Sequence, residues 1–167
     1  MNIEMMKKLE LKLRRLRHEE HYNQTTWAGR TACGTAACLA GHAVLMVPKV
    51  KLVFENGDEH THICRVPEGH TVTIDTFASE LLGLRYEEAN VLFTDSPELF
   101  WPDEFRERWK NRATGKDSEG EKPSRIAADL LRAVVEGEVD LTENLDRDED
   151  EDDYDYYDDD EDDEEED

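Results

Sequence analysis

The fold of this chain is restricted above all by residues 36–47, which are apolar on every side apart from His42. A helix without a polar face is stable only when other elements cover it. Thr35 can cap the start of such a helix through its hydroxyl group, and Pro48 can end it. Small side chains allow close approach of neighbouring elements at four positions, Ala36, Ala37, Ala40 and Gly41. We therefore predict that residues 36–47 form a buried central helix.

Apolar residues at three- and four-residue spacing predict several more helices. Their expected ranges are 3–21, 75–82, 86–93, 102–112 and 125–136. Pro102 and Ser124 lie where two of these helices begin, and Gly83 and Gly137 lie where two of them end. Residues 23–35 are polar and predict a loop.

One β-hairpin is expected over residues 49–66, because Asn56-Gly57 is a strong signal for a tight turn. Loops of two or four residues both fit this turn. Either register places the same three side chains on the outer, solvated face, namely those of His60, His62 and Cys64. The sequence thus predicts an α+β fold that is mainly α, with a buried central helix, one hairpin and several short helices.

The charge of the chain is unevenly distributed. The formal net charge is −23, and residues 146–167 contain 18 of the 43 acidic side chains, together with one arginine and three tyrosines. So dense a run of like charge repels itself and offers too little apolar surface to fold. We expect an amphipathic N-terminal helix in residues 1–25, a compact α+β domain in residues 26–142, and a disordered acidic tail in residues 143–167.

The acidic tail is a candidate for a partner-binding segment, because dense carboxylates attract a basic protein surface. The residues expected to contact such a partner are Asp152, Asp153, Tyr154, Tyr156, Tyr157 and Asp158. Two other interpretations stay open. The tail either increases solubility without binding anything, or it shields the basic side chains of segment 3–21, which are Lys7, Lys8, Lys12, Arg14, Arg15 and Arg17.

Cys33, Cys38 and His42 form a candidate metal site, with His42 one helical turn after Cys38. Thiolates and imidazoles are ligands of zinc, but a structural zinc ion needs four of them. The fourth ligand would come from elsewhere in the chain, from His60, His62, Cys64 or His70. The alternative is that Cys38 and His42 are core residues and that His42 is bonded to a backbone carbonyl. Apart from this zinc ion, no cofactor is expected.

Cys33 also fits the role of a nucleophile, because a helix N-terminus lowers the pKa of a thiol and His42 can act as a base. The sequence offers no third orienting residue and no oxyanion motif. We therefore favour a protein that is not an enzyme and keep a thiol-dependent enzyme as an alternative.

Segment 77–93 has the apolar and glycine spacing of a helix-turn-helix. Glu87 and Glu88 on its second helix are unfavourable beside phosphates, so nucleic-acid binding is not expected.

The sequence contains no run of about 18 apolar residues, so no membrane span is expected. Three cysteines and an N-terminus without an apolar signal segment indicate a reducing cytoplasm.

Residues 33–41 read Cys-Gly-Thr-Ala-Ala-Cys-Leu-Ala-Gly and follow a tryptophan, Trp27. This C-G-T-x-x-C-[IL]-A-G motif resembles that of a family of small uncharacterised proteins from bacteria and their phages. Segments 78–84, 92–93 and 131–140 are similar to later parts of the family pattern. The resemblance covers roughly residues 27–141 and implies no particular activity. It also implies that tryptophan is accepted at the His42 position, which weakens a metal role for His42.

These observations together favour a non-enzymatic phage or bacterial accessory protein that binds a macromolecular partner, with its acidic tail on a basic surface. If the chain is encoded by a phage, the expected cytoplasm is that of the bacterial host. The alternatives are a small zinc-binding structural or regulatory domain that uses Cys33, Cys38 and His42, and a thiol-dependent enzyme that uses Cys33.

Overall fold

The computed structural model describes residues 1–32, 34–55, 57–114 and 119–143. Its helices are α1 (Ile3–Arg14), a 3-10 turn η1 (Glu19–His21), α2 (Leu39–Val44), α3 (Ile74–Leu82), α4 (Tyr86–Leu92), α5 (Pro97–Phe100), α6 (Asp103–Lys110) and α7 (Pro123–Glu136). Its strands are β1 (Ala28–Thr31), β2 (Gly34–Ala37), β3 (Lys51–Leu52), β4 (His60–Thr61), β5 (Ile63–Arg65) and β6 (Thr71–Thr73). The fold is α+β and mainly α, as the sequence predicts. The predicted disordered tail lies outside the described residues, apart from Glu143.

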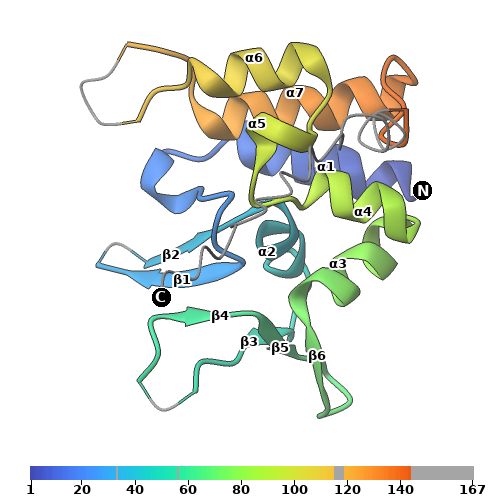
Figure 1. The fold of residues 1–167 in the computed structure, drawn as a ribbon. Coiled ribbons are helices and arrows are strands. Elements are labelled where there is room, and N and C mark those ends of the chain that lie inside the picture. The colour runs from blue at the N-terminus through green and yellow to red at the C-terminus, as the bar shows by residue number, and fades with distance from the viewer. Residues whose placement is uncertain (33, 56, 115–118, 144–167) are drawn as a thin grey trace, which may run out of the picture.

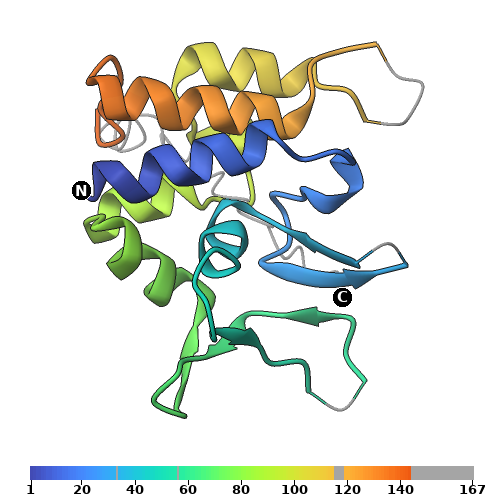
Figure 2. The same cartoon turned by 180° about the vertical axis from the view of Figure 1, so that it is seen from behind.

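Helix α2 lies at the centre of the molecule, between a layer of helices and two small sheets (Figure 1). Helices α1 and α7 run side by side on one side of α2, and the reverse view shows the sheets on the other side (Figure 2). All six residues of α2 are buried. The prediction of a buried central helix is therefore confirmed, although its length is not.

Helices α1 and α7 pack against each other in an antiparallel arrangement. Apolar residues at three- and four-residue spacing are buried on both helices, namely Met6, Leu9 and Leu13 on α1 and Ile126, Leu130 and Val134 on α7. Two ion pairs at the edge of the interface between α1 and α7 show that the helices run in opposite directions. Arg14 contacts Asp129, and Arg132 contacts Glu10. The end of α7 consequently lies beside the start of α1, where the N-terminus is marked (Figure 1).

The strands form two three-stranded antiparallel sheets, in the orders β2-β1-β4 and β3-β5-β6. In the first sheet, Ala28 of β1 lies between Ala37 of β2 and Thr61 of β4. In the second sheet, Cys64 of β5 lies between Leu52 of β3 and Val72 of β6. The chain passes from one sheet to the other between β4 and β5.

The predicted loop over residues 23–35 is wrong, because β1 and the first part of β2 lie within it. The two strands form a hairpin that joins Ala28 to Ala37 and Thr31 to Gly34. Strand β1 is only four residues long, with its first two residues buried and its last two exposed. So short a strand without alternation leaves no period-two signal in the sequence.

The predicted central helix is too long at both ends. Ala36 and Ala37 belong to β2, and Cys38, not Thr35, is the N-cap of α2. Main-chain pairing with β1 therefore outweighs the high helix propensity of the two alanines. The helix ends at Val44, before the expected stop at Pro48.

The predicted single hairpin over residues 49–66 is split between the two sheets, which changes its register. Leu52 lies opposite Cys64, so both share the inner face, and Cys64 is 0% exposed. The expectation that Cys64 lies on the outer face is wrong. His60 and His62 are exposed, as predicted. Because the chain changes sheets at His62, the alternation of inward and outward side chains after this residue is shifted by one position relative to a continuous strand.

The ends of the other helices agree only partly with the predictions. Gly83 and Gly137 end α3 and α7 in the left-handed conformation that favours glycine, with φ of 61° and 75°. Helix α1 stops at Arg14, well before residue 21. Ser124 is not an N-cap, because it lies inside α7 and is buried. Lys122 occupies the N-cap position, without a capping hydrogen bond from its side chain. Strand β6 and helix α5 were not predicted.

Candidate functional site

A groove of about 670 Å³ opens between the segment that precedes β1 and the helical pair α3–α4. Three aromatic residues line it, Trp27, Tyr86 and Phe93, and so do three carboxylates, Asp75, Glu80 and Asp95. The remaining lining is largely small or polar, with Thr25, Thr76, Ser79, Asn90 and Thr94 among its residues. None of the described residues that line the groove is a lysine or an arginine.

The helical period explains why α3 and α4 present polar and aromatic side chains to this groove. On α3, Ile74, Ala78 and Leu82 are buried in the core. Residues that alternate with them, Asp75 and Glu80 among them, then face outward into the groove. The other wall is formed by residues three to four positions apart on α4 and at its C-cap, namely Tyr86, Ala89, Asn90 and Phe93.

The base of the groove is held by the buried side chain of Gln24, which is 3% exposed. Its Nε2 donates to the carbonyl oxygens of Thr94 at 2.8 Å and of Leu92 at 3.3 Å. Its Oε1 accepts from the hydroxyl of Tyr22 at 2.6 Å and from the amide of Leu39 at 3.3 Å. One amide side chain thus joins the end of α4 to the start of α2 and satisfies its own hydrogen-bonding groups.

The composition of the groove favours positively charged ligands. Three acidic side chains, Asp75, Glu80 and Asp95, are exposed along it. The face of an aromatic ring attracts a guanidinium or ammonium group within about 6 Å. The groove combines aromatic rings with carboxylates, and none of its described lining residues is a lysine or an arginine. It is therefore suited to bind the lysine or arginine side chains of a partner.

A smaller hollow of about 350 Å³ continues on the other side of Trp27 and Thr25. His60, Thr61 and His62 line it. The exposed histidines that the sequence placed on an outer face therefore lie next to the groove, separated from it by Trp27.

Cys38 lies at the N-cap of α2 and is buried. Its Sγ is 3.7 Å from the carbonyl oxygen of Trp27. Burial raises the pKa of the Cys38 thiol to about 11, so at neutral pH it is a thiol and a weak nucleophile. Cys64, on β5 of the second sheet, is buried, and burial raises its pKa as well.

His42 is a core residue, 2% exposed, and its ring stacks on that of Tyr22 with centroids 6.0 Å apart. Its Nε2 lies 2.9 Å from the carbonyl oxygen of His21, so it carries the proton and donates to that carbonyl. Burial, with a smaller contribution from the charge of Lys12, lowers the pKa of His42 to about 4. The imidazole is therefore neutral at pH 7. This geometry matches the alternative in which His42 is bonded to a backbone carbonyl.

The zinc hypothesis and the hypothesis of a nucleophilic cysteine both depend on Cys33, which lies outside the described residues. Both hypotheses stay predictions. In the described part of the chain, no group of three or more His, Cys, Asp or Glu side chains is arranged to hold a metal ion. Two of the proposed ligands, Cys38 and His42, contact backbone carbonyls instead.

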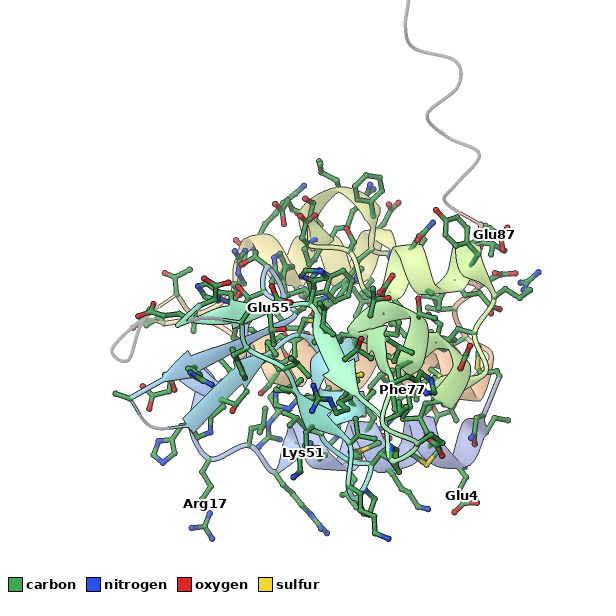
Figure 3. The ribbon with its side chains drawn as sticks, turned by 90° about the horizontal axis from the view of Figure 1, so that it is seen from below. Glu4, Arg17, Lys51, Glu55, Phe77 and Glu87 are labelled. Carbon is green, nitrogen blue, oxygen red and sulfur yellow. The ribbon has the colours of Figure 1, made fainter. Side chains whose placement is uncertain are left out.

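The helix-turn-helix candidate corresponds to α3, Gly83 and α4. Glu88 accepts a hydrogen bond from the amide of Arg85 at 2.7 Å and thereby caps the start of α4. Glu87 lies at the outer edge of the molecule (Figure 3). The partner-binding residues predicted in the tail, Asp152 to Asp158, lie outside the described residues.

Neither family models, nor curated proteins, nor solved structures give a match to this chain. The resemblance built on Cys33, Cys38 and Gly41 therefore stays a prediction.

None of the helices in the described ranges has the length and apolar character needed to cross a membrane.

The groove is not among the sites predicted from the sequence. The signal was present in α3, where the polar residues Asp75, Thr76, Ser79 and Glu80 recur at helical spacing opposite the apolar ones. Asp95 and Trp27 come from segments read as connections, and only the tertiary fold brings them to the same place.

Proposed function

We propose that this protein is a non-enzymatic binding protein that recognises a basic segment of a macromolecular partner. The groove between Trp27, α3 and α4 receives lysine or arginine side chains. The acidic residues 146–167 attract the partner and increase the rate of encounter.

The observation that carries the proposal is the combination of Asp75, Glu80 and Asp95 with Trp27 and Tyr86 in one groove. A guanidinium group between a ring and a carboxylate gains from both the ring quadrupole and the ion pair. Tyr86 is 77% exposed, so its ring is accessible to a ligand in the groove.

The charge distribution supports the same class of partner. Residues 146–167 carry 18 acidic side chains against one arginine. A field of this sign speeds the association of basic partners and repels acidic ones, and the effect falls with ionic strength. Exposed charges act over about one Debye length, roughly 10 Å at 0.1 M salt.

The test is calorimetric titration of the full chain with octa-arginine and with octa-glutamate as the opposite-charge control. We expect binding of octa-arginine alone, with an affinity that falls at least about tenfold between roughly 50 mM and 500 mM salt. Binding of both peptides, or of neither, would contradict the proposal.

A matched pair of variants separates the groove from general acidity. The groove variant carries Asp75→Asn, Glu80→Gln and Asp95→Asn. The control variant removes the same charge from exposed positions elsewhere, through Glu104→Gln, Glu136→Gln and Glu138→Gln. We expect the groove variant to lose at least about tenfold more affinity than the control, because tenfold is about 1.4 kcal/mol and an exposed charge pair contributes about 0–1 kcal/mol. Equal losses would show that the groove does not recognise the peptide.

A further inference from the structure

A second charged surface, formed by α1 and the residues that directly follow it, is basic. Six lysines and arginines and only one acidic residue, Glu10, occur between residues 7 and 17. The exposed members of this set are Lys7, Lys8, Arg15 and Arg17, which we call the α1 basic face. Arg17 and Glu4 mark the two ends of this edge of the molecule in Figure 3.

The packing of the helix uses the other two cations. Arg14 contacts Glu10 and Asp129, and Lys12 Nζ donates to the carbonyl oxygen of His42 at 3.0 Å. On the α1 basic face, Lys8 pairs with Glu4 at 2.6 Å. Lys7, Arg15 and Arg17 form no ion pair with any other residue that the structure describes.

The exposed surface of α1 is not purely polar. Leu11 is 46% exposed and lies between Lys7 and Arg15 at four-residue spacing, so the three side chains form one stripe along the helix. An apolar contact flanked by cations matches a segment that contains both carboxylates and aromatic rings. Residues 146–167 have this composition, with 18 acidic side chains and three tyrosines.

The described chain ends at Glu143, seven residues after α7. Because α7 runs antiparallel to α1, its end lies beside the start of α1 (Figure 1). The 24 residues after Glu143 can span up to about 80 Å when extended. Helix α1 is 12 residues long, or about 18 Å, so the following segment reaches the whole α1 basic face.

We propose that residues 144–167 bind the α1 basic face of the same chain. Attachment at Glu143 gives the segment an effective concentration on the order of millimolar, so weak individual ion pairs suffice. The contact loosens with salt. The α1 basic face then competes with a basic partner for the acidic segment, and the partner displaces it on binding. Only this regulatory consequence rests on the proposed function.

The test is zero-length carbodiimide cross-linking of the full chain, followed by mass spectrometry. This reagent joins an amine to a carboxylate only where the two are in contact. Cross-links from residues 144–167 are counted to Lys7 and Lys8 and compared with those to the exposed lysines Lys110 and Lys122. Lys12 is excluded from the count, because burial lowers its pKa to about 8 and increases the reactivity of its amine.

We expect the cross-links to favour Lys7 and Lys8 at least about fivefold at low salt and to lose this preference near 0.5 M salt. An equimolar mixture of heavy-isotope and normal protein distinguishes contacts within one chain from contacts between chains. Equal cross-linking of all four lysines would overturn the proposal, and so would cross-links that mainly join heavy to normal chains.

A variant that leaves the reporter lysines intact completes the test. Arg15→Glu with Arg17→Glu reverses part of the α1 basic face and should reduce the cross-links to Lys7 and Lys8 several-fold. Arg30→Glu with Arg65→Glu reverses two exposed arginines elsewhere and should leave them unchanged. An equal reduction in both variants would show that only overall charge matters. The experiment contains no partner, so its failure would leave the proposed function untouched.

Discussion

His42 donates a hydrogen bond from Nε2 to the backbone carbonyl oxygen of His21, at 2.9 Å. This contact ties the central helix α2 to the turn that follows α1, and the ring of Tyr22 lies parallel to the imidazole at an interplanar angle of 1°. The residue that most resembled a ligand or a base in the sequence thus acts as a structural element. Its titration should be visible in the stability of the protein.

The first prediction concerns pH. The pKa of His42 is lowered from 6.5 to about 4 in the folded chain, chiefly by burial. The unfolded chain therefore binds more protons between these values, and the free energy of unfolding should fall as the pH drops from about 6.5 to 4. The loss from His42 amounts to about 3 kcal/mol. His42→Phe should remove most of this slope in urea unfolding series, whereas the exposed-site control His60→Gln should keep it. An unchanged slope in His42→Phe would contradict the assignment.

The second prediction concerns Gly41, which packs against the backbone of Trp27. A Cβ atom at position 41 would lie 2.1 Å from the carbonyl oxygen of Trp27, and a backbone atom cannot move aside easily. Glycine-to-alanine changes inside helices usually stabilise by up to about 1 kcal/mol. Gly41→Ala should instead destabilise by at least about 3 kcal/mol in thermal or urea unfolding.

The control for Gly41 is Leu45→Ala at the end of the same helix, where Leu45 is 41% exposed. That change should cost less than about 1 kcal/mol. A Gly41→Ala variant as stable as the parent would show that α2 does not lie this close to the segment before β1.

The third prediction concerns Gln24 at the base of the groove. Gln24→Met keeps the size of the side chain and removes both its donor and its acceptor. The amide of Leu39 and the carbonyl of Thr94 would lose their side-chain partner, at a cost of about 3 kcal/mol in the free energy of unfolding. Thr25→Ala, at an exposed position beside it, serves as the control and should change the stability little. Similar stability of both variants would refute the bridging role of Gln24.

The fourth prediction concerns the ion pairs between α1, α6 and α7. Asp129 accepts from Arg14 and Arg108, and Arg108 also binds Glu121 with its Nε 2.8 Å from Oε2. Burial alone would raise the pKa of Asp129, but the two arginines outweigh it and hold that pKa below its usual range. Asp129→Asn should cost about 1–2 kcal/mol above pH 5 and less at lower pH, where the carboxylate is protonated.

The matched control for Asp129 is Glu107→Gln, which removes an exposed pair with Lys110. Exposed pairs of this type contribute about 0–1 kcal/mol. If both variants lose the same stability in chemical unfolding, the Asp129 network is no stronger than a surface pair.

Local signals in the sequence were sufficient where one residue determines one conformation. Gly83 and Gly137 adopt the left-handed conformation at the ends of α3 and α7, as expected. The apolar segment around Leu39 and Val44 is buried because it has no polar face to expose.

Local signals failed where pairing between distant segments determines the conformation. Ala36 and Ala37 favour a helix locally, yet they pair with β1, which has no sequence signature of its own. Cys64 is buried because the chain changes sheets at His62, and no local rule predicts that change. The groove escaped detection for the same reason, since Trp27 and Asp95 are separated by 68 positions and meet only in the folded chain.

The most direct test of the central claim is backbone amide NMR of the full chain during titration with octa-arginine. The account predicts that the largest chemical-shift changes occur at Thr76, Ser79 and Asn90, which line the groove, and that they saturate together. Changes confined to residues 144–167, or spread evenly over every exposed acidic residue, would contradict recognition by the groove.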